Sequence, residues 1–147
     1  MERFVTFVNN INLIYRCVQK IKNNEMTEFG LKGMHVMCMF HLNHSKTALT
    51  AARLSVLCGE DKAAISRAVA DLAAKGLIDF TDRESQLKYR APITLTPQGI
   101  EVADRMDSII EFVVDKGGNG LTDEERAGFY KALELIADNL KTFISEE

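Results

Sequence analysis

The feature that most restricts the fold is a change of hydrophobic period at Gly76. Residues 61–75 carry apolar side chains at the spacing of one helix face. Residues 78–81 and 86–95 instead alternate between apolar and polar side chains, as half-buried strands do. The polar segment 82–85 separates the two alternating stretches. The sequence therefore predicts a helix that is followed directly by a β-hairpin.

A shorter helix is predicted just before this pair of elements. Thr50 is a typical capping residue, an apolar segment follows through Cys58, and Gly59 is a typical helix terminator. Asp61 then caps the next helix. Two short helices with a tight turn between them and a two-stranded ribbon behind them are typical of a winged helix-turn-helix. We expect a mainly α fold with a small β-hairpin.

Longer helices are predicted on both sides of this module. The first has a narrow apolar seam from Phe4 to Ile21, and residues 31–42 form an almost continuously apolar helix. Pro97 opens a helix that ends before the glycines of 117–120. The last helix begins at a capping box, Thr122 with Glu125, and its seam comprises Phe129, Leu133, Ile136, Leu140 and Phe143.

The two seams predict how the chain is organised. One small domain cannot fully bury both of them, whereas two-fold pairing of identical chains can. We therefore expect a homodimer in which residues 1–30 and 98–147 are dimerisation helices and residues 31–97 form the winged-helix module of a single 147-residue unit. Such pairing places two recognition helices about 34 Å apart, one turn of DNA.

Net charge alone argues against a nucleic-acid partner, but its distribution does not. The formal charge is −3. Residues 1–96 contain 13 basic and 9 acidic side chains, whereas residues 97–147 contain 5 basic and 12 acidic ones. The acidic excess thus lies in the last third, and double-stranded DNA can dock on the first two-thirds.

Other classes of protein are not supported by the sequence. It has no apolar run of the roughly 18 residues that a membrane span needs, and its start lacks the apolar stretch of a signal peptide. Its three cysteines are an odd number without a CxxC pair, which predicts no disulfide framework and a cytoplasmic location. Phosphate-binding loops, GxSxG and HExxH motifs are missing. We expect no enzyme, no catalytic residue, no cofactor, no metal and no membrane partner.

The second helix of the pair has a narrow outer face. With Ile65, Val69 and Leu72 turned inward, a spacing of 100° per residue turns the opposite face outward. That face is mostly methyl groups with one guanidinium and one hydroxyl on its flank, so it can approach base edges closely in the major groove. It comprises Ala63, Ser66, Arg67, Ala70 and Ala74.

The hairpin supplies cations beside this helix. Lys88 and Arg90 share one polar strand face, and Arg83 lies near the tip. Three cations on one ribbon suit phosphate or narrow-groove contacts. Lys62, in the first turn of the helix, can reach phosphate. The predicted DNA-binding residues are Lys62, Ala63, Ser66, Arg67, Ala70, Arg83, Lys88 and Arg90.

Residues 49–78, LTAARLSVLCGEDKAAISRAVADLAAKGLI, resemble the DNA-binding core of the MarR family of bacterial repressors. Residues 95–99, LTPQG, resemble the family's LTxxG exit from the wing. The resemblance implies a homodimeric transcriptional repressor on a pseudo-palindromic operator, with Lys62, Ala63, Ser66 and Arg67 at contact positions of the recognition helix. The wing departs from the family pattern, since Leu87, Lys88 and Tyr89 stand where relatives carry Asp-x-Arg. The wing cation is therefore Arg83, Lys88 or Arg90.

The signal that would control such a regulator has three interpretations. The resemblance implies a small apolar or aromatic effector, and we place Met34, His35 and Cys38 at its cleft, since methionine adapts to varied ligands. In the second interpretation Cys17 senses an oxidant, because the neighbouring Arg16 favours its thiolate form. A metal is the third, although the three-residue steps of His35, Cys38, His41 and His44 drift around a helix and cannot converge on one ion. A winged helix that binds protein instead of DNA is the alternative function.

Overall fold

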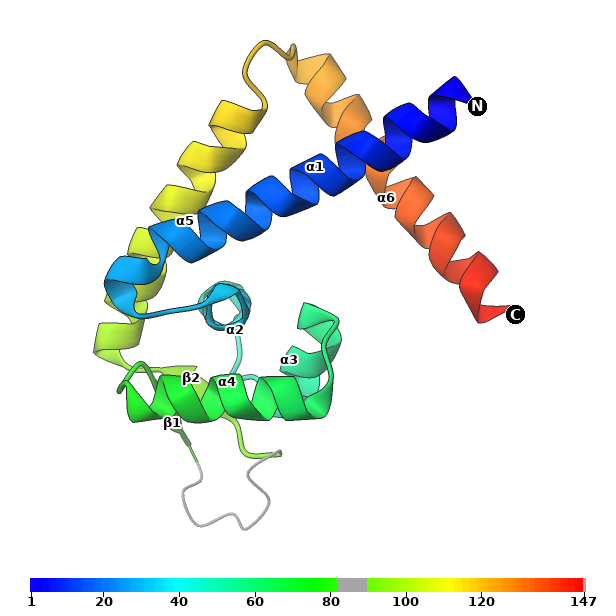
Figure 1. The fold of residues 1–147 in the computed structure, drawn as a ribbon. Helices are drawn as coiled ribbons and strands as arrows, with labels where there is room; N and C mark the ends of the chain where they lie inside the picture. Colours follow the sequence, from blue (N-terminus) through cyan, green and yellow to red (C-terminus); the bar gives the residue numbers. More distant parts are fainter. Residues whose placement is uncertain (82–89, 147) are drawn as a thin grey trace. The chain divides into compact units, whose positions relative to one another are not determined.

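The computed structural model describes residues 1–81 and 90–146. The chain divides into two compact units, Met1–Ile109 and Ile110–Glu147. The first unit holds α1 (Glu2–Glu25), a 3-10 turn η1 (Thr27–Phe29), α2 (Gly33–His44), α3 (Ala51–Cys58), α4 (Lys62–Ala74), β1 (Ile78–Phe80), β2 (Ile93–Leu95) and most of α5 (Pro97–Gly117) (Figure 1). The second unit holds the end of α5 and α6 (Asp123–Ser145). The predicted fold class, mainly α with a small β-hairpin, is confirmed.

Helix ends follow the predicted capping residues. At the start of α6, Thr122 Oγ1 accepts a hydrogen bond from the backbone N–H of Glu125, and the Glu125 carboxylate accepts one from the backbone N–H of Thr122. Pro97 opens α5 as predicted. Two details differ from the sequence prediction: α2 continues two residues beyond Leu42, and η1 was not expected. Short 3-10 turns carry no periodic signal that a sequence could reveal.

Among the described residues, the paired strands are shorter than the alternating pattern predicts, and residues 86–89 of that pattern lie outside the described structure. Ile78, Asp79 and Phe80 pair antiparallel with Leu95, Thr94 and Ile93. The second strand was expected to begin near residue 87, but residues 90–92 form a turn and a bend ahead of β2. Pro92 has no N–H to donate and only accepts, through its carbonyl, from the backbone N–H and the hydroxyl of Thr81. Within the described residues, the last strand pair is therefore Phe80 with Ile93.

A third segment joins this small sheet. Leu49, just before α3, exchanges two backbone hydrogen bonds with Ile93, at 2.7 and 3.2 Å. Ile93 is thus paired on one side with Phe80 of β1 and on the other with Leu49. Its side chain is fully buried. The strand that leads out of the hairpin is anchored in this way to the entry of the helical pair.

The core of the first unit lies between α2, α3, α4 and β2 (Figure 1). Its fully buried side chains include Met39, Leu54, Ile65, Leu72 and Ile93. Burial of each aliphatic side chain stabilises the fold by about 1.5–3 kcal/mol. Helices as short as α3 and α4 are not stable alone, so this packing keeps them folded.

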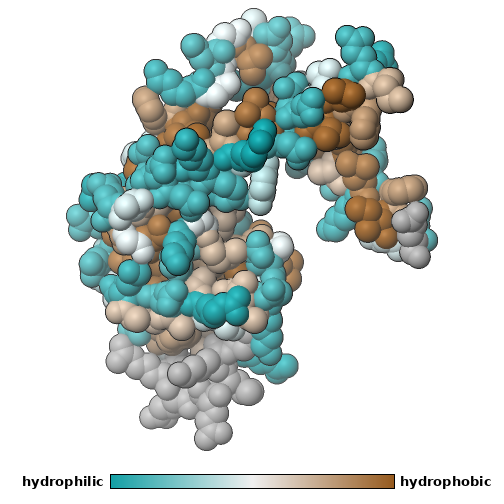
Figure 2. Space-filling view, in the orientation of Figure 1, coloured by the Kyte–Doolittle hydropathy of each residue, from teal (hydrophilic) through white to brown (hydrophobic). Residues whose placement is uncertain are grey.

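Helices α1 and α6 have no buried residue. Their apolar seams remain exposed within the chain, and Figure 2 shows the brown side chains of α6 on its surface. The exposed fraction is 67% for Phe4 and 50% for Ile14 in α1, and 51% for Leu140 and 61% for Phe143 in α6. Contiguous apolar surface of this kind marks an interaction site in a soluble protein.

Candidate nucleic-acid interface

The helix-turn-helix is held by one side-chain cap at each helix start. Thr50 Oγ1 accepts from the backbone N–H of Arg53 at 3.1 Å, and Asp61 Oδ1 accepts from the backbone N–H of Ala64 at 2.7 Å. Gly59 ends α3 in the left-handed conformation, with φ of 65°. The Ser55 hydroxyl donates to the Glu60 carbonyl and closes the turn. The predicted boundaries of both helices are confirmed, and hydrogen bonds close the turn between them.

Helix α4 presents the two faces that its sequence predicts. Ile65 and Leu72 are fully buried, and Val69 lies beside them in the core. The opposite face is open to solvent and carries Lys62, Ala63, Ser66, Arg67, Ala70 and Ala74. Small side chains around one guanidinium leave the backbone of this helix accessible, which is the shape needed to enter a major groove.

A histidine ties α4 to α2 from the buried side. The ring of His35 accepts from the backbone N–H of Lys32 through Nδ1 at 3.0 Å, which leaves Nε2 to face Asp71 Oδ2 at 3.3 Å. The His35 side chain is 7% exposed, whereas that of Asp71 is 64% exposed. The orientation of α4 thus depends on a polar contact as well as on its apolar stripe.

The predicted wing cations are only partly within the described structure. Arg90 is exposed and lies in the turn before β2 instead of on a strand face. Arg83 and Lys88 lie outside the described residues. Their assignment as DNA contacts therefore stays a prediction, as does the identity of the wing cation.

The LTPQG segment explains how the hairpin is joined to α5. Thr96 donates its backbone N–H to the Leu77 carbonyl and its hydroxyl to the Gly76 carbonyl, at 3.0 and 2.6 Å. The same hydroxyl accepts from the backbone N–H of Gly99. A Cβ on Gly99 would lie 1.9 Å from the Leu77 carbonyl oxygen, so glycine permits this close approach. The segment locks the end of α4, the hairpin and α5 together.

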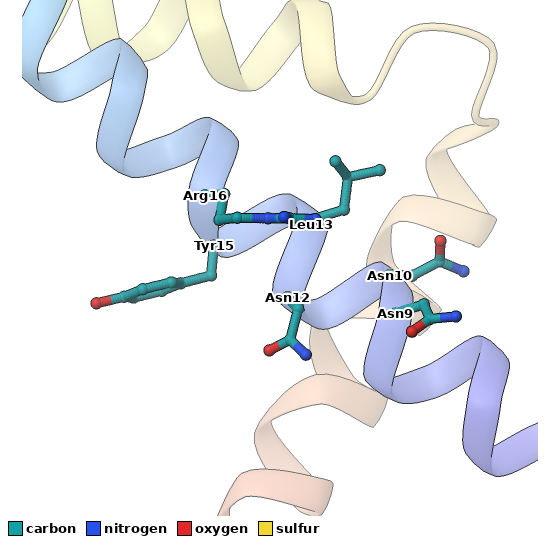
Figure 3. Close-up of a pocket in the computed structure, with 6 residues that line it drawn as sticks. All are labelled: Asn9, Asn10, Asn12, Leu13, Tyr15 and Arg16. Atoms are coloured by element: carbon teal, nitrogen blue, oxygen red, sulfur yellow. The ribbon is translucent and has the colours of Figure 1, made fainter.

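The three residues assigned to an effector cleft are mostly occupied by contacts within the chain. Met34 is half-buried, His35 faces Asp71, and Cys38 is fully buried. A pocket of about 470 Å³ lies instead along α1 (Figure 3) and includes none of these three. The residues that line it are all exposed and all belong to α1: Asn9, Asn10, Asn12, Leu13, Tyr15 and Arg16.

The histidines of α2 lie in different surroundings. His44 Nε2 lies 3.0 Å from Asp107 Oδ2 of α5, beside Asn43, which donates to the carboxylates of Asp104 and Asp107. Burial lowers the pKa of His41, and the charge of nearby His44 lowers it further. Within residues 1–81 and 90–146, no three histidine, cysteine or acidic side chains are arranged to hold a metal ion.

Neither α5 nor any other helix in the described part of the chain is both long and apolar enough to cross a membrane. Cys17, the residue considered for oxidant sensing, is exposed on α1.

Comparison with known proteins agrees with this geometry. A model of the MarR family matches residues 29–86. The chain is 27% identical over 138 residues to the HTH-type transcriptional regulator TcaR of Staphylococcus aureus, covering 93% of this chain and 88% of TcaR. A Listeria monocytogenes MarR-family regulator solved with a 26mer DNA has a TM-score of 0.80 at 20% identity, covering 90% and 87% of the two chains. S. aureus MarR, solved with salicylate and kanamycin, has a TM-score of 0.84 at 15% identity, covering 96% and 94%. The model of the MarR family thus matches the central part of the chain, and nearly the whole chain is similar to a transcriptional regulator and shares its fold with MarR-family structures.

Proposed function

We propose that this chain is a homodimeric repressor that reads a pseudo-palindromic operator through α4 and is released by a small ligand. The observation that carries the proposal is the outer face of α4, where Arg67 and Ser66 stand among exposed alanines on a capped, firmly packed helix. Arginine pairs with guanine O6 and N7, and alanine methyls contact thymine methyls. The neighbour solved with DNA supports this use of the fold.

The remaining proposed contacts position the protein without reading bases. Lys62 lies at the N-terminus of α4, where backbone N–H groups also favour a phosphate. Arg90 lies at the base of the wing, and Arg83 and Lys88 belong to the residues outside the described structure. These cations add a salt-dependent, sequence-independent part to the binding free energy.

The experiment that tests this function is selection of bound duplexes from a random pool, followed by mobility shifts over a salt series. A two-fold symmetric site with half-sites one DNA turn apart, and an affinity that falls steeply with salt, support the proposal. If no duplex is retained even at low ionic strength, α4 is not a DNA-reading helix. A winged helix that binds protein is then the remaining function.

We expect Arg67→Ala to relax base preference at one position of each half-site by about 1–3 kcal/mol, because a bidentate contact to guanine is lost. Arg53→Ala on α3 is the matched control, since it removes the same charge from an exposed position that is not on the outer face of α4. Shifts with single-base operator variants measure both. Equal losses on every sequence for Arg67→Ala would contradict base reading by this residue.

The dimer is expected to form through the exposed seams of α1 and α6. Two-fold pairing buries apolar side chains such as Phe4, Ile14 and Phe143 that the single chain leaves in water. Sedimentation should give twice the chain mass of 16.5 kDa at micromolar concentration. A mass of one chain there would contradict the dimer. Residues 1–30 and 98–147 are accordingly proposed as dimerisation helices and residues 31–97 as the DNA-binding module.

The effector is proposed to be a small apolar or aromatic molecule. The S. aureus MarR neighbour solved with salicylate supports this class of ligand. Of the three residues assigned to the site, Met34 offers accessible surface, while His35 and Cys38 lie behind it in the core. We also propose a cytoplasmic location, where the operator is.

A further inference from the structure

The turn that joins α5 to α6 contains an asparagine in an unusual position. The chain has eight asparagines, all of them among the described residues, and seven lie inside α1, α2 or α6. Asn119 is the exception, because it follows the end of α5 in an exposed turn (Figure 1). It is also the only asparagine that is followed by a glycine, Gly120. The chemistry open to its side chain therefore differs from that of the others.

The backbone of this turn leaves the nitrogen of Gly120 accessible. The Leu121 N–H donates to the Gly118 carbonyl at 3.1 Å and closes the turn, in which Gly120 has φ of 89°. In the part of the chain that the structure describes, neither the Gly120 N–H nor the side-chain amide of Asn119 makes a hydrogen bond, and nothing beyond the chain neighbours lies within 4 Å of a Cβ placed on Gly120. The side-chain carbonyl of Asn119 can thus approach this nitrogen freely.

The helical asparagines are held away from this geometry. In an α-helix the N–H of the following residue donates to the carbonyl four residues before it. That nitrogen is engaged in the helix, and the backbone angles on both sides of it are fixed. Asn9 and Asn10 of α1 are exposed as Asn119 is, so exposure alone does not set Asn119 apart. The difference lies in the free backbone nitrogen that follows it.

We propose that Asn119 is a site of spontaneous deamidation, since asparagine is a labile residue and glycine places no side chain in the way of ring closure. The Gly120 nitrogen gives up its proton and attacks the side-chain carbonyl carbon of Asn119. The new C–N bond closes a five-membered succinimide, and the amide nitrogen takes up a proton and leaves as ammonia. One water molecule then opens the ring at either carbonyl, which gives aspartate or isoaspartate. Nothing is oxidised or reduced.

The isoaspartate product would change how α6 leaves the turn. Its main chain runs through the former side chain, which inserts one methylene group between residues 119 and 120 and leaves a free carboxylate beside it. Arg126 of α6 donates through Nη2 to the Gly118 carbonyl at 3.2 Å, and the same carbonyl accepts from Leu121. The longer main chain moves both donors, so the start of α6 loses its attachment to the end of α5. The resulting loss of chain pairing rests on the proposed function, whereas the modification itself does not.

The site is tested by ageing the full chain in warm, mildly alkaline buffer and mapping it with trypsin. Residues 117–126 form one tryptic peptide, and Asn119 is its only asparagine. This peptide should gain about 1 Da, because OH replaces NH2, and separate on chromatography into an aspartate and an isoaspartate form. Peptide 4–16, which carries three asparagines of α1, is the internal control and should keep its mass. A fresh sample digested in parallel corrects for deamidation during digestion.

Asn119→Gln is the matched variant, because it keeps the amide while its longer side chain closes the corresponding ring far more slowly. Sedimentation at one fixed concentration compares fresh and aged protein. The aged unmodified chain should lose dimer in proportion to its isoaspartate content, whereas aged Asn119→Gln should sediment as the fresh protein does.

Four results are informative against these claims. If peptide 117–126 keeps its mass, or peptide 4–16 gains mass equally, the turn is not a selective site. If aspartate forms without isoaspartate, the succinimide route is wrong. If isoaspartate forms and the dimer is unchanged, the product does not loosen α6. A fresh protein that sediments as one chain counts against the proposed homodimer, and the peptide map still decides whether Asn119 is modified.

Discussion

Gly99→Ala is expected to destabilise the protein by about 3 kcal/mol, the upper part of the range for overpacked sites. The added Cβ would lie 1.9 Å from the carbonyl oxygen of Leu77 and 2.9 Å from its carbonyl carbon. These are backbone atoms, so no rotamer change can relieve the clash. The Leu77 carbonyl also accepts from the backbone N–H of Thr96, and moving it weakens the junction between the hairpin and α5.

Urea denaturation followed by circular dichroism measures this loss. Gly117→Ala is the matched control, because nothing lies within 4 Å of a Cβ at that helical position. It should be neutral or stabilise slightly, by up to about 1 kcal/mol, since alanine favours helix more than glycine does. If Gly99→Ala and the unmodified chain unfold at the same urea concentration, the added Cβ causes no loss of stability. That result would contradict the close packing of Gly99 against the Leu77 carbonyl.

Ile65→Ala is expected to cost about 2–5 kcal/mol of stability and to abolish operator binding at moderate temperature. Ile65 is fully buried on the inner face of α4. Its removal leaves a cavity between α4 and the rest of the core, and the helix that carries Arg67 loses its main anchor. Affinity falls because the recognition helix is no longer held in one orientation, although no contacting residue has changed.

Ile65→Val is the matched control for Ile65→Ala. It removes one methyl group and should lower the free energy of unfolding by about 0.5–1.5 kcal/mol. Thermal unfolding and mobility shifts are recorded on both variants. We expect affinity to follow stability across the pair, with Ile65→Val retaining specific binding. Normal operator affinity of a destabilised Ile65→Ala protein would mean that α4 does not depend on this anchor.

Local chemistry accounts for what the sequence predicted well. Thr50, Asp61 and Thr122 are side-chain caps that satisfy nearby backbone N–H groups, so each helix start is encoded within four residues. The period of the apolar residues identified the inner face of α4 for the same reason. These signals do not depend on the rest of the fold.

Contacts between distant segments could not be predicted in this way. The contact of His35 with Asp71 joins residues whose proximity is fixed only when α2 packs on α4. Sequence reasoning therefore assigned His35 and Cys38 to a ligand cleft from their residue types alone. The ladder between Leu49 and Ile93 was missed because a single bridge has no period.

That ladder has a consequence for how DNA specificity can change. Leu49 and Ile93 fix the entry of the helical pair to the exit of the wing through backbone hydrogen bonds, which substitutions at the surface leave intact. Under the proposed function, the main chain fixes where the wing begins relative to the helical pair, whereas the side chains on α4 determine which bases are preferred. On that proposal, substitutions on α4 can change the base preference while the backbone link between the helical pair and the wing stays the same.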